Sequence, residues 1–300
     1  MIISVASFQG QAAAKSTLEL VVLGSGGPVA DNTRASSGYL VKVSGSPRIL
    51  IDAGGGTFQR FGQAQIPASA IDVILLTHLH IDHTADLPAI LKSAYFQKRG
   101  SRPISIFGPR GNKGFPSTSE FMDGLIGPKG IYRYFTAFAK KVVKTEVKIS
   151  TVDLESDPKK PVVKTVWERD GIKITSIPVV HGPAPSLAYR IDAGGECISF
   201  SGDLNSSSGN LVKLAKDCDI LVYDTAIPES ATGIAVKLHS KPSAVSTAAS
   251  KAAVKHLVLS HIMPPSENAL WRINEIVRTN FSGKTTVARD LITIPAVETK

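Results

Sequence analysis

The chain has 300 residues, of which 43% are hydrophobic and 20% charged, so it can bury the core of one large domain. No hydrophobic run approaches the roughly 20 residues that a membrane-spanning helix needs, which argues against insertion into a membrane. Lys and Arg outnumber Asp and Glu by 34 to 25, and the net charge of +9 would either attract anionic substrates or serve solubility alone.

The first 16 residues predict a flexible terminus ahead of a single domain over residues 17–300. Within this terminus, GQAAAK at residues 10–15 resembles the small-residue end of an export signal, although the preceding MIISVASF is short and has no basic start. We therefore expect a periplasmic or secreted protein, and a cytoplasmic protein is the alternative.

Short apolar or β-branched runs recur along the chain and predict strands. In chain order they are LELVVLG, GYLVKV, DVILLT, ISIFG, IKITSIPVV, SLAYRI, CISFSG, DILVYD and HLVLS. Helical patterns lie between or after them, near residues 84–97, 209–217, 242–254 and 267–280. This mixture predicts a layered α/β protein.

Several stretches predict loops. Residues 108–130 are rich in Gly, Pro and Lys and predict an excursion from the sheet, and a second loop is expected at residues 155–161. LGSGGP, at residues 23–28, fits neither a phosphate-binding P-loop nor a dinucleotide-binding turn. We expect it to form a tight loop near the functional site.

The two cysteines each open an apolar run that predicts a strand, six residues before an aspartate. Cys197 precedes Asp203, and Cys218 precedes Asp224. If the two strands are neighbours in a sheet, the thiols could lie at the same level, and a disulfide would fit an oxidising compartment. Two buried free thiols are the favoured prediction.

Potential metal ligands directly follow several of the predicted strands. His78 follows VILLT, His181 follows IPVV, Asp203 follows ISFSG and His261 follows LVLS. The sheet holds strand ends rigidly while the loops beyond them present side chains, so the sites of α/β proteins collect there. The sequence therefore predicts one site formed by distant parts of the chain.

The densest cluster of such residues is HLHIDH, from His78 to His83. If the backbone is extended there, His78 and His80 lie on one side, and Asp82 and His83 can turn toward a second ion. Imidazole and carboxylate groups without a thiolate suit a catalytic zinc site that keeps a position open for water.

The segment THLHIDH resembles the HxHxDH signature of the metallo-β-lactamase superfamily, and His181, Asp203 and His261 lie where its later motifs fall. The resemblance extends over nearly the whole chain. It implies a four-layer αββα sandwich and two zinc ions, with manganese or iron as alternatives on ligand type alone. The ligands that it implies are His78, His80 and His181 for one ion, Asp82, His83 and His261 for the other, and Asp203 as a bridge.

Asp52, in ILIDAGGG, matches a further motif of the superfamily, in which a carboxylate supports a metal-bound histidine without touching the metal. Such a partner fixes the tautomer and the direction of an imidazole ligand. A turn residue is the alternative role for Asp52.

LGSGGP, YDTAIPE and LHSKPSAVSTAASKAAVKHLVLSH resemble the branch of the superfamily that contains the tRNA 3′-processing ribonuclease Z. In that branch a histidine before an Ala-rich helix assists the leaving group and an acidic residue orients it, and the counterparts are His239 and Asp224. Asp224 replaces the Glu of the family, and Lys241 stands where Thr is usual. The residues expected to transfer a proton to the leaving group therefore depart from the family pattern. A surface histidine is the alternative for His239, and His256 is expected to be merely exposed.

An RNA-binding arm is absent from the expected position. Ribonuclease Z proteins similar to this chain carry a long arm rich in Gly, Pro and Lys between the third-motif histidine and the bridging aspartate. Only 22 positions separate His181 from Asp203, and they predict two strands and a turn.

A basic surface elsewhere could bind RNA, because residues 129–148 interleave aromatic side chains with cations. Its aromatic residues also fit the buried face of a helix, which is the favoured interpretation. They are Tyr132, Phe135 and Phe138.

We predict a dinuclear zinc hydrolase of a phosphodiester or a related small anionic ester. Asp82 or Asp203 would orient the nucleophilic water, and His239, polarised by Asp224, would protonate the leaving oxygen. The alternatives are a lactone or β-lactam hydrolase, a tRNA 3′-processing endoribonuclease, and a metal-binding protein without turnover. Nucleic acid is therefore an alternative partner that the sequence does not favour. A homodimer is expected only because related proteins are often dimers.

Overall fold

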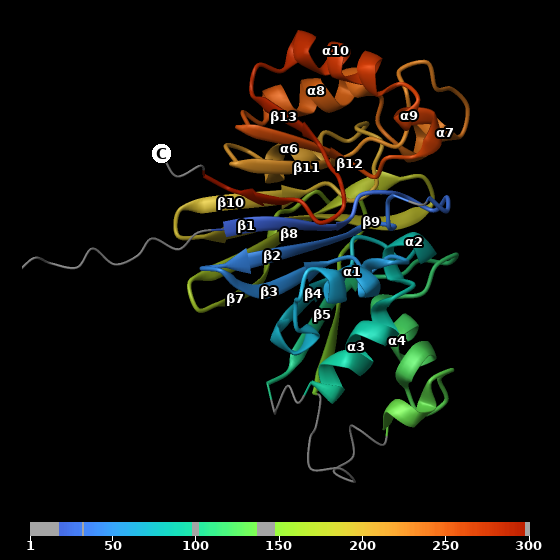
Figure 1. The fold of residues 1–300 in the computed structure, drawn as a ribbon. Helices are drawn as coiled ribbons and strands as arrows, with labels where there is room; N and C mark the ends of the chain where they lie inside the picture. Colours follow the sequence, from blue (N-terminus) through green and yellow to red (C-terminus); the bar gives the residue numbers. More distant parts are fainter. Residues whose placement is uncertain (1–17, 32, 98–101, 137–147, 298–300) are drawn as a thin grey trace, which may run out of the picture.

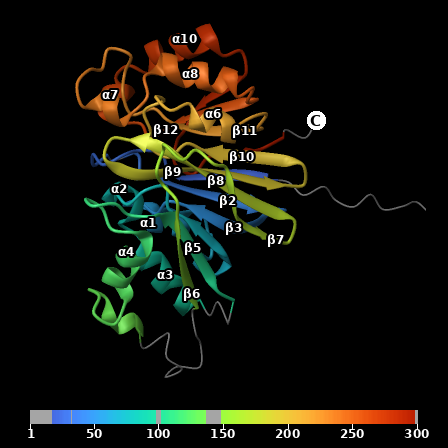
Figure 2. The ribbon, with the colours of Figure 1, turned by 180° about the vertical axis from the view of Figure 1, so that it is seen from behind.

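The computed structural model describes residues 18–31, 33–97, 102–136 and 148–297. In these ranges two mixed β-sheets face each other, and helices cover the outer face of each sheet (Figure 1, Figure 2). This arrangement confirms the predicted four-layer αββα sandwich.

The first sheet comes from the N-terminal half of the chain and one C-terminal strand. Its order is β14 (Thr293–Pro295), β1 (Leu18–Gly24), β2 (Gly38–Val43), β3 (Ser46–Ile51), β4 (Val73–Leu75), β5 (Ile104–Pro109) and β6 (Ile149–Leu154). Its outer face is covered by α1 (Thr57–Gln63), α3 (Leu87–Phe96) and α4 (Thr118–Ile126). Leu40, Ile74 and Ile90 belong to the apolar cluster of this layer.

The second sheet comes from the C-terminal half. Its order is β13 (Lys284–Val287), β12 (His256–Ser260), β11 (Ile220–Asp224), β10 (Glu196–Phe200), β9 (Ala184–Ala193), β8 (Ile172–His181) and β7 (Lys164–Arg169). Its outer face is covered by α6 (Asn210–Leu214), α8 (Pro242–Lys251) and α10 (Leu270–Asn280). The shorter elements are α2 (Ile81–Thr84), α7 (Ala235–Leu238), α9 (Pro264–Glu267) and the 3-10 turns η1 (Ala68–Ala70) and η2 (Arg133–Phe135).

The main core lies between the two sheets. In β1, Leu20 and Val22 pack between the sheets while Val21 and Leu23 pack beneath the helices, because successive side chains of a strand point to opposite faces. The hydroxyl of the buried Tyr189 in β9 donates a hydrogen bond to the backbone oxygen of Leu76 (3.0 Å). This bond joins the second sheet to the segment after β4, two residues before His78.

Each apolar run that predicts a strand contains one, and all the predicted helical regions contain helices. Five further strands, β3, β6, β7, β13 and β14, have no such run. They are short, lie at sheet edges or begin with polar residues, so their burial patterns are weak.

The Gly- and Pro-rich residues 108–130 do not remain irregular, because α4 begins there. The hydroxyl of Ser117 accepts a hydrogen bond from the Glu120 backbone (3.2 Å), and the Glu120 carboxylate accepts one from the Ser117 backbone (2.7 Å). This capping box stabilises the helix start that the composition obscures.

The predicted buried aromatic face is only partly correct. Phe135 is buried, but Tyr132 is 39% exposed, because a 3-10 turn replaces the expected α-helix around them. Phe138 lies outside the described residues.

Two predictions for single residues are wrong. Cys197 and Cys218 form a disulfide rather than two free thiols, since β10 and β11 are parallel neighbours and bring the two Cα atoms to 5.3 Å. His256 is buried rather than exposed, because it opens the interior strand β12, and its Nε2 lies 2.9 Å from the hydroxyl of Thr286.

The segment between His181 and Asp203 is filled by β9, β10 and their tight turn, as predicted from its length. Among the described residues, no helix has both the length and the apolar character to cross a membrane.

Candidate metal centre

Side chains with metal-binding groups gather at one edge of the sandwich, on the side of α2, α7 and α9 in Figure 1. His78 follows β4, His181 ends β8, Asp203 follows β10, and His261 follows β12. These strand ends belong to both sheets, and the packing of the sheets brings them together. All seven ligands expected from the resemblance lie in this cluster: His78, His80, Asp82, His83, His181, Asp203 and His261.

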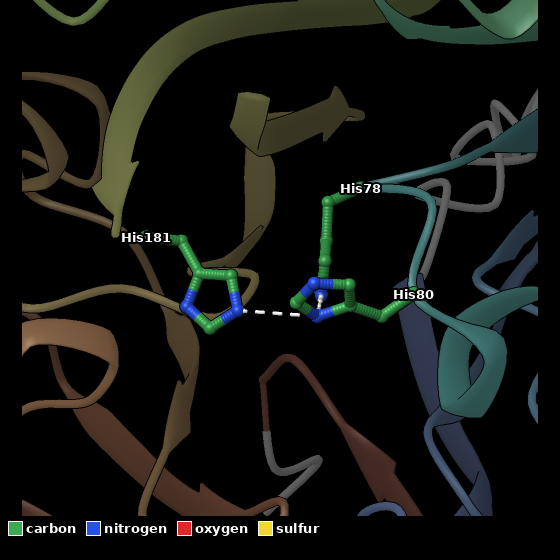
Figure 3. Close-up of side chains that lie close together, drawn as sticks. All are labelled: His78, His80 and His181. Atoms are coloured by element: carbon green, nitrogen blue, oxygen red, sulfur yellow. Dashed lines mark hydrogen bonds between the residues drawn. The ribbon is translucent and has the colours of Figure 1, made fainter. Parts of the chain in front are cut away.

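The first group consists of three histidines, His78, His80 and His181, which point ring nitrogens toward one another in Figure 3. His80 Nδ1 lies 3.0 Å from His78 Nε2 and 3.3 Å from His181 Nε2. Three nitrogens bound to one tetrahedral zinc would lie about 3.3 Å apart. The spacing of this group therefore fits a shared metal ion.

Neutral imidazole is the form that binds a metal, and burial favours it here. Burial lowers the pKa of His78 well below its ordinary value. It also lowers the pKa values of His80 and His181. His181 Nδ1 lies 2.8 Å from the backbone oxygen of Leu238, and this contact leaves Nε2 of the same ring directed to the group.

The second group consists of Asp82, His83 and His261. Asp82 Oδ2 lies 3.5 Å from His83 Nε2 and 3.3 Å from His261 Nε2. Buried His83 Nε2 has no hydrogen-bond partner among the described residues, as expected of an atom that binds a metal. The donor set of two imidazoles and a carboxylate fits zinc and related ions.

Asp203 lies between the two groups. Its carboxylate oxygens are 3.5 Å from His83 Nε2 and 3.2 Å from His261 Nε2, and 3.9 Å from His78 Nε2. Burial alone would raise the pKa of Asp203, but the imidazoles of His261 and His83 hold it well below its ordinary value. A buried anion within reach of both groups is suited to bridge two cations.

Asp52 lies behind His83, where it supports the ring. Its Oδ2 is 2.7 Å from His83 Nδ1, and it also accepts hydrogen bonds from the backbone and the hydroxyl of Thr77, each 2.8 Å long. Burial alone would lower the pKa of His83, but the Asp203 and Asp52 carboxylates raise it well above its ordinary value. The two carboxylates favour positive charge at this position, which a metal ion would supply.

Thr77 is a residue of the site that the sequence analysis does not single out. It ties Asp52 to the segment that carries His78, and its hydroxyl lies 3.1 Å from His78 Nδ1. Its position directly before HLHIDH is the only signal that the sequence offers.

His239 and Asp224 form a pair beside both groups. His239 Nδ1 lies 2.7 Å from Asp224 Oδ2. The His239 ring is 5.4 Å from that of His181 and 5.5 Å from that of His261. Burial alone would lower the pKa of His239, but the Asp224 carboxylate raises it to about 9.

One grouping was not expected from the sequence. His239 and Asp224 also form a possible ligand set with Asp203 and His261, because His239 Nδ1 is 4.0 Å from Asp203 Oδ2. The 2.7 Å hydrogen bond to Asp224 already engages this nitrogen, so we interpret His239 as a partner of Asp224 rather than as a ligand.

The backbone around the site is tightly constrained. Asp52 and His261 both have a φ of 56°, a conformation that non-glycine residues rarely adopt and that marks functional sites. A Cβ on Gly27 would lie 2.6 Å from His261 Cε1, which confirms that the LGSGGP loop lies beside the site. A Cβ on Gly54 would lie 2.0 Å from the backbone oxygen of Asp82.

We expect Gly54→Ala to weaken binding of the second metal ion by about 10- to 100-fold, as for other changes that displace a ligand indirectly. The new methyl group would push α2, which carries Asp82 and His83. Gly62→Ala is the matched control, because its Cβ meets nothing within 4 Å and alanine suits helix α1. Chelator competition measures the affinity, and an unchanged value for Gly54→Ala would refute the packing argument.

A model of the Beta-lactamase superfamily domain matches residues 47–262 of the chain. A relative named ribonuclease Z, from Mycobacterium bovis (strain BCG / Pasteur 1173P2), is 29% identical over 287 residues, which cover 91% of this chain and 96% of the relative.

Solved structures with the same fold include human tRNase Z, short form, with a TM-score of 0.69 and 23% identity over 92% of this chain and 98% of that chain. The metallo-beta-lactamase fold protein YhfI from Bacillus subtilis has a TM-score of 0.67 and 20% identity over 94% of this chain and 100% of that chain. At these identities the structures establish the likeness of the fold alone.

Proposed function

The chain belongs to the beta-lactamase superfamily, and from this premise we propose that it is a dinuclear metal-dependent phosphodiesterase that cleaves RNA near a 3′ end. The main support for metal-dependent hydrolysis is the position of Asp203 between two groups of ligand-type side chains. The choice of RNA rests on the relatives.

We assign His78, His80 and His181 to one ion, Asp82, His83 and His261 to the other, and Asp203 to both. Zinc is the ion that we propose, because the spacing and the donor types suit it. Two such ions, when bound, polarise the scissile group and lower the pKa of a nucleophilic water.

The chain's own residues orient and protonate the reacting atoms. Asp82 and Asp203, as buried carboxylates, accept a hydrogen bond from the attacking water and so direct it toward phosphorus. Asp224 holds His239 through Nδ1, which leaves Nε2 to give a proton to the departing oxygen. Asp52 and Thr77 hold His83 in place and take no part in proton transfer.

The relatives favour RNA over the small anionic ester that the sequence alone favoured. The curated relatives reported above and others at similar identity carry the name ribonuclease Z, and the match spans nearly all of both chains. The likeness in fold to human tRNase Z is compatible with this substrate. We therefore prefer tRNA 3′ processing, which was an alternative in the sequence analysis, to a small ester.

A small phosphodiester is the second candidate, and two observations favour it. The tight turn between β9 and β10 occupies the place of the RNA-binding arm expected of ribonuclease Z. The Cys197–Cys218 disulfide suits an oxidising compartment and so supports export, which agrees better with scavenging than with RNA maturation.

Parallel turnover assays distinguish the candidates. We expect the zinc-loaded protein to cleave a precursor tRNA and a chromogenic phosphodiester, with the RNA preferred, and His78→Ala to abolish both reactions. Preference for the small diester would favour the second candidate. Opening of a lactone or β-lactam, with neither phosphodiester cleaved, would reject the proposal.

A further inference from the structure

A cavity of about 400 Å³ lies beside the metal centre. Three segments form its walls: the loop after β5, the loop between β6 and β7, and the turn between β8 and β9. His181, the last residue of β8, lines this cavity, and its Nε2 belongs to the first group of ligands. The volume is in the range of small-ligand sites.

The walls of the cavity are held by side-chain hydrogen bonds. Asn112 Nδ2 donates to the backbone oxygen of Pro183 (2.9 Å), which ties the β5 loop to the β8–β9 turn. The hydroxyl of the buried Ser156 donates to the backbone oxygen of Arg110 (2.6 Å). The buried Asn210 donates to the backbone oxygens of Pro158 (3.1 Å) and Pro178 (3.0 Å), so each wall is fixed to a neighbour.

The charged side chains that line the cavity are two acids and two cations. Glu155 accepts hydrogen bonds from the backbones of Ser156 and Asp157 (both 3.1 Å) and pairs with Lys160 at 3.5 Å. Asp157 accepts a hydrogen bond from the Lys159 backbone (3.0 Å) and lies 4.0 Å from the ammonium of Lys160. Both carboxylates are therefore engaged within their own loop.

The two cations, Arg110 and Lys159, remain available. Neither of their charged groups forms an ion pair or a hydrogen bond within the ranges that the structure describes. They come from different walls, the β5 loop and the β6–β7 loop. Cations from two fixed walls, next to a site for a phosphodiester, can bind a further phosphate.

We propose that this cavity binds a second phosphate group of the substrate, next to the scissile one, through Arg110 and Lys159. The inference rests on the proposed function for the identity of the substrate. The cavity thereby gives the enzyme a preference for oligonucleotides over simple diesters.

A binding measurement tests the cavity without catalysis. Metal-free protein is titrated with adenosine 5′-phosphate and with adenosine, and we expect the phosphate to strengthen binding. Arg110→Ala and Lys159→Ala should each weaken binding of the nucleotide by about three- to tenfold and leave binding of adenosine unchanged. Lys251→Ala is the matched control, because it removes an exposed cation from α8, which forms no part of the cavity walls.

Equal binding of nucleotide and nucleoside, or an equal effect of all three variants, would overturn the proposal. With metal-loaded protein, the two cavity variants should raise KM for a trinucleotide more than for a dinucleotide, with kcat unchanged. If no RNA is cleaved at all, the proposed function fails, whereas the result with adenosine 5′-phosphate still decides the cavity.

Discussion

We expect Asp203→Asn to reduce turnover by on the order of 10³-fold or more, since the loss of one electrostatic contact in an active site already costs about 10²- to 10³-fold. The amide keeps the size of the side chain but removes the charge that lies within 3.9 Å of both groups of histidines. The variant should also retain less than the full complement of two metal ions. Kinetics with a phosphodiester, together with the metal content of the purified protein, measures both effects.

Asp219→Asn is the matched control for this variant. Asp219 is also buried, accepts a hydrogen bond from the Cys197 backbone (2.8 Å) and pairs with Lys255 (2.6 Å) just before β11, at the end of the strand opposite Asp224. Its loss should lower the free energy of unfolding by about 1–3 kcal/mol while metal content and turnover stay normal. If Asp203→Asn behaved in the same way, its bridging role would be refuted.

The layered fold could be predicted from the sequence where strands are buried on both faces. β1, β11 and β12 are nearly continuous apolar runs because the core packs on one side and helices pack on the other. β6 and β7 lie at sheet edges and contain no buried residue, β6 exposing alternate residues and β7 exposing the two residues at each of its ends, so their composition resembles that of a loop. The four-layer arrangement was implied by the family resemblance, whereas the order and pairing of the strands required the structure.

The cluster of ligand-type side chains could be predicted because histidine is rare in the chain and because His78, His181, Asp203 and His261 each follow an apolar run, while the full set of seven ligands was implied by the family resemblance. Asp52 was expected as a partner of a metal-bound histidine, but two other supporting contacts could not be predicted in the same way. Thr77 supports Asp52 through one backbone and one hydroxyl hydrogen bond, and the backbone oxygen of Leu238 holds His181. A threonine and a leucine carry no chemical signature, and a contact made by a backbone atom leaves no trace in the residue type.

The disulfide illustrates a further limit of the sequence. The equal spacing of Cys197 and Cys218 from the following aspartates already suggested sulfurs at one level, provided that the strands were neighbours. Because the pairing of β10 with β11 is a property of the sheet order, the choice between thiols and a disulfide required the structure.

We expect His239→Ala to reduce cleavage of precursor tRNA by about 10²- to 10⁴-fold, the usual contribution of a general acid. The sugar oxygen that leaves in this reaction needs a proton. A nitrophenolate leaves as a stable anion, so cleavage of a nitrophenyl phosphodiester should fall far less. Asp224→Asn should show the same dependence on the leaving group to a smaller degree, because the Asp224 carboxylate only orients the His239 ring through its 2.7 Å hydrogen bond.

His256→Ala is the control for the loss of a buried histidine, because His256 contacts Thr286 at the opposite end of β12 from His261. It should affect stability and leave the ratio of the two activities unchanged. The metal content of His239→Ala separates two roles, since His239 also lies within reach of Asp203 and His261. Two retained ions with a selective loss of RNA cleavage indicate a proton donor, whereas one lost ion with equal loss of both activities would make His239 a ligand.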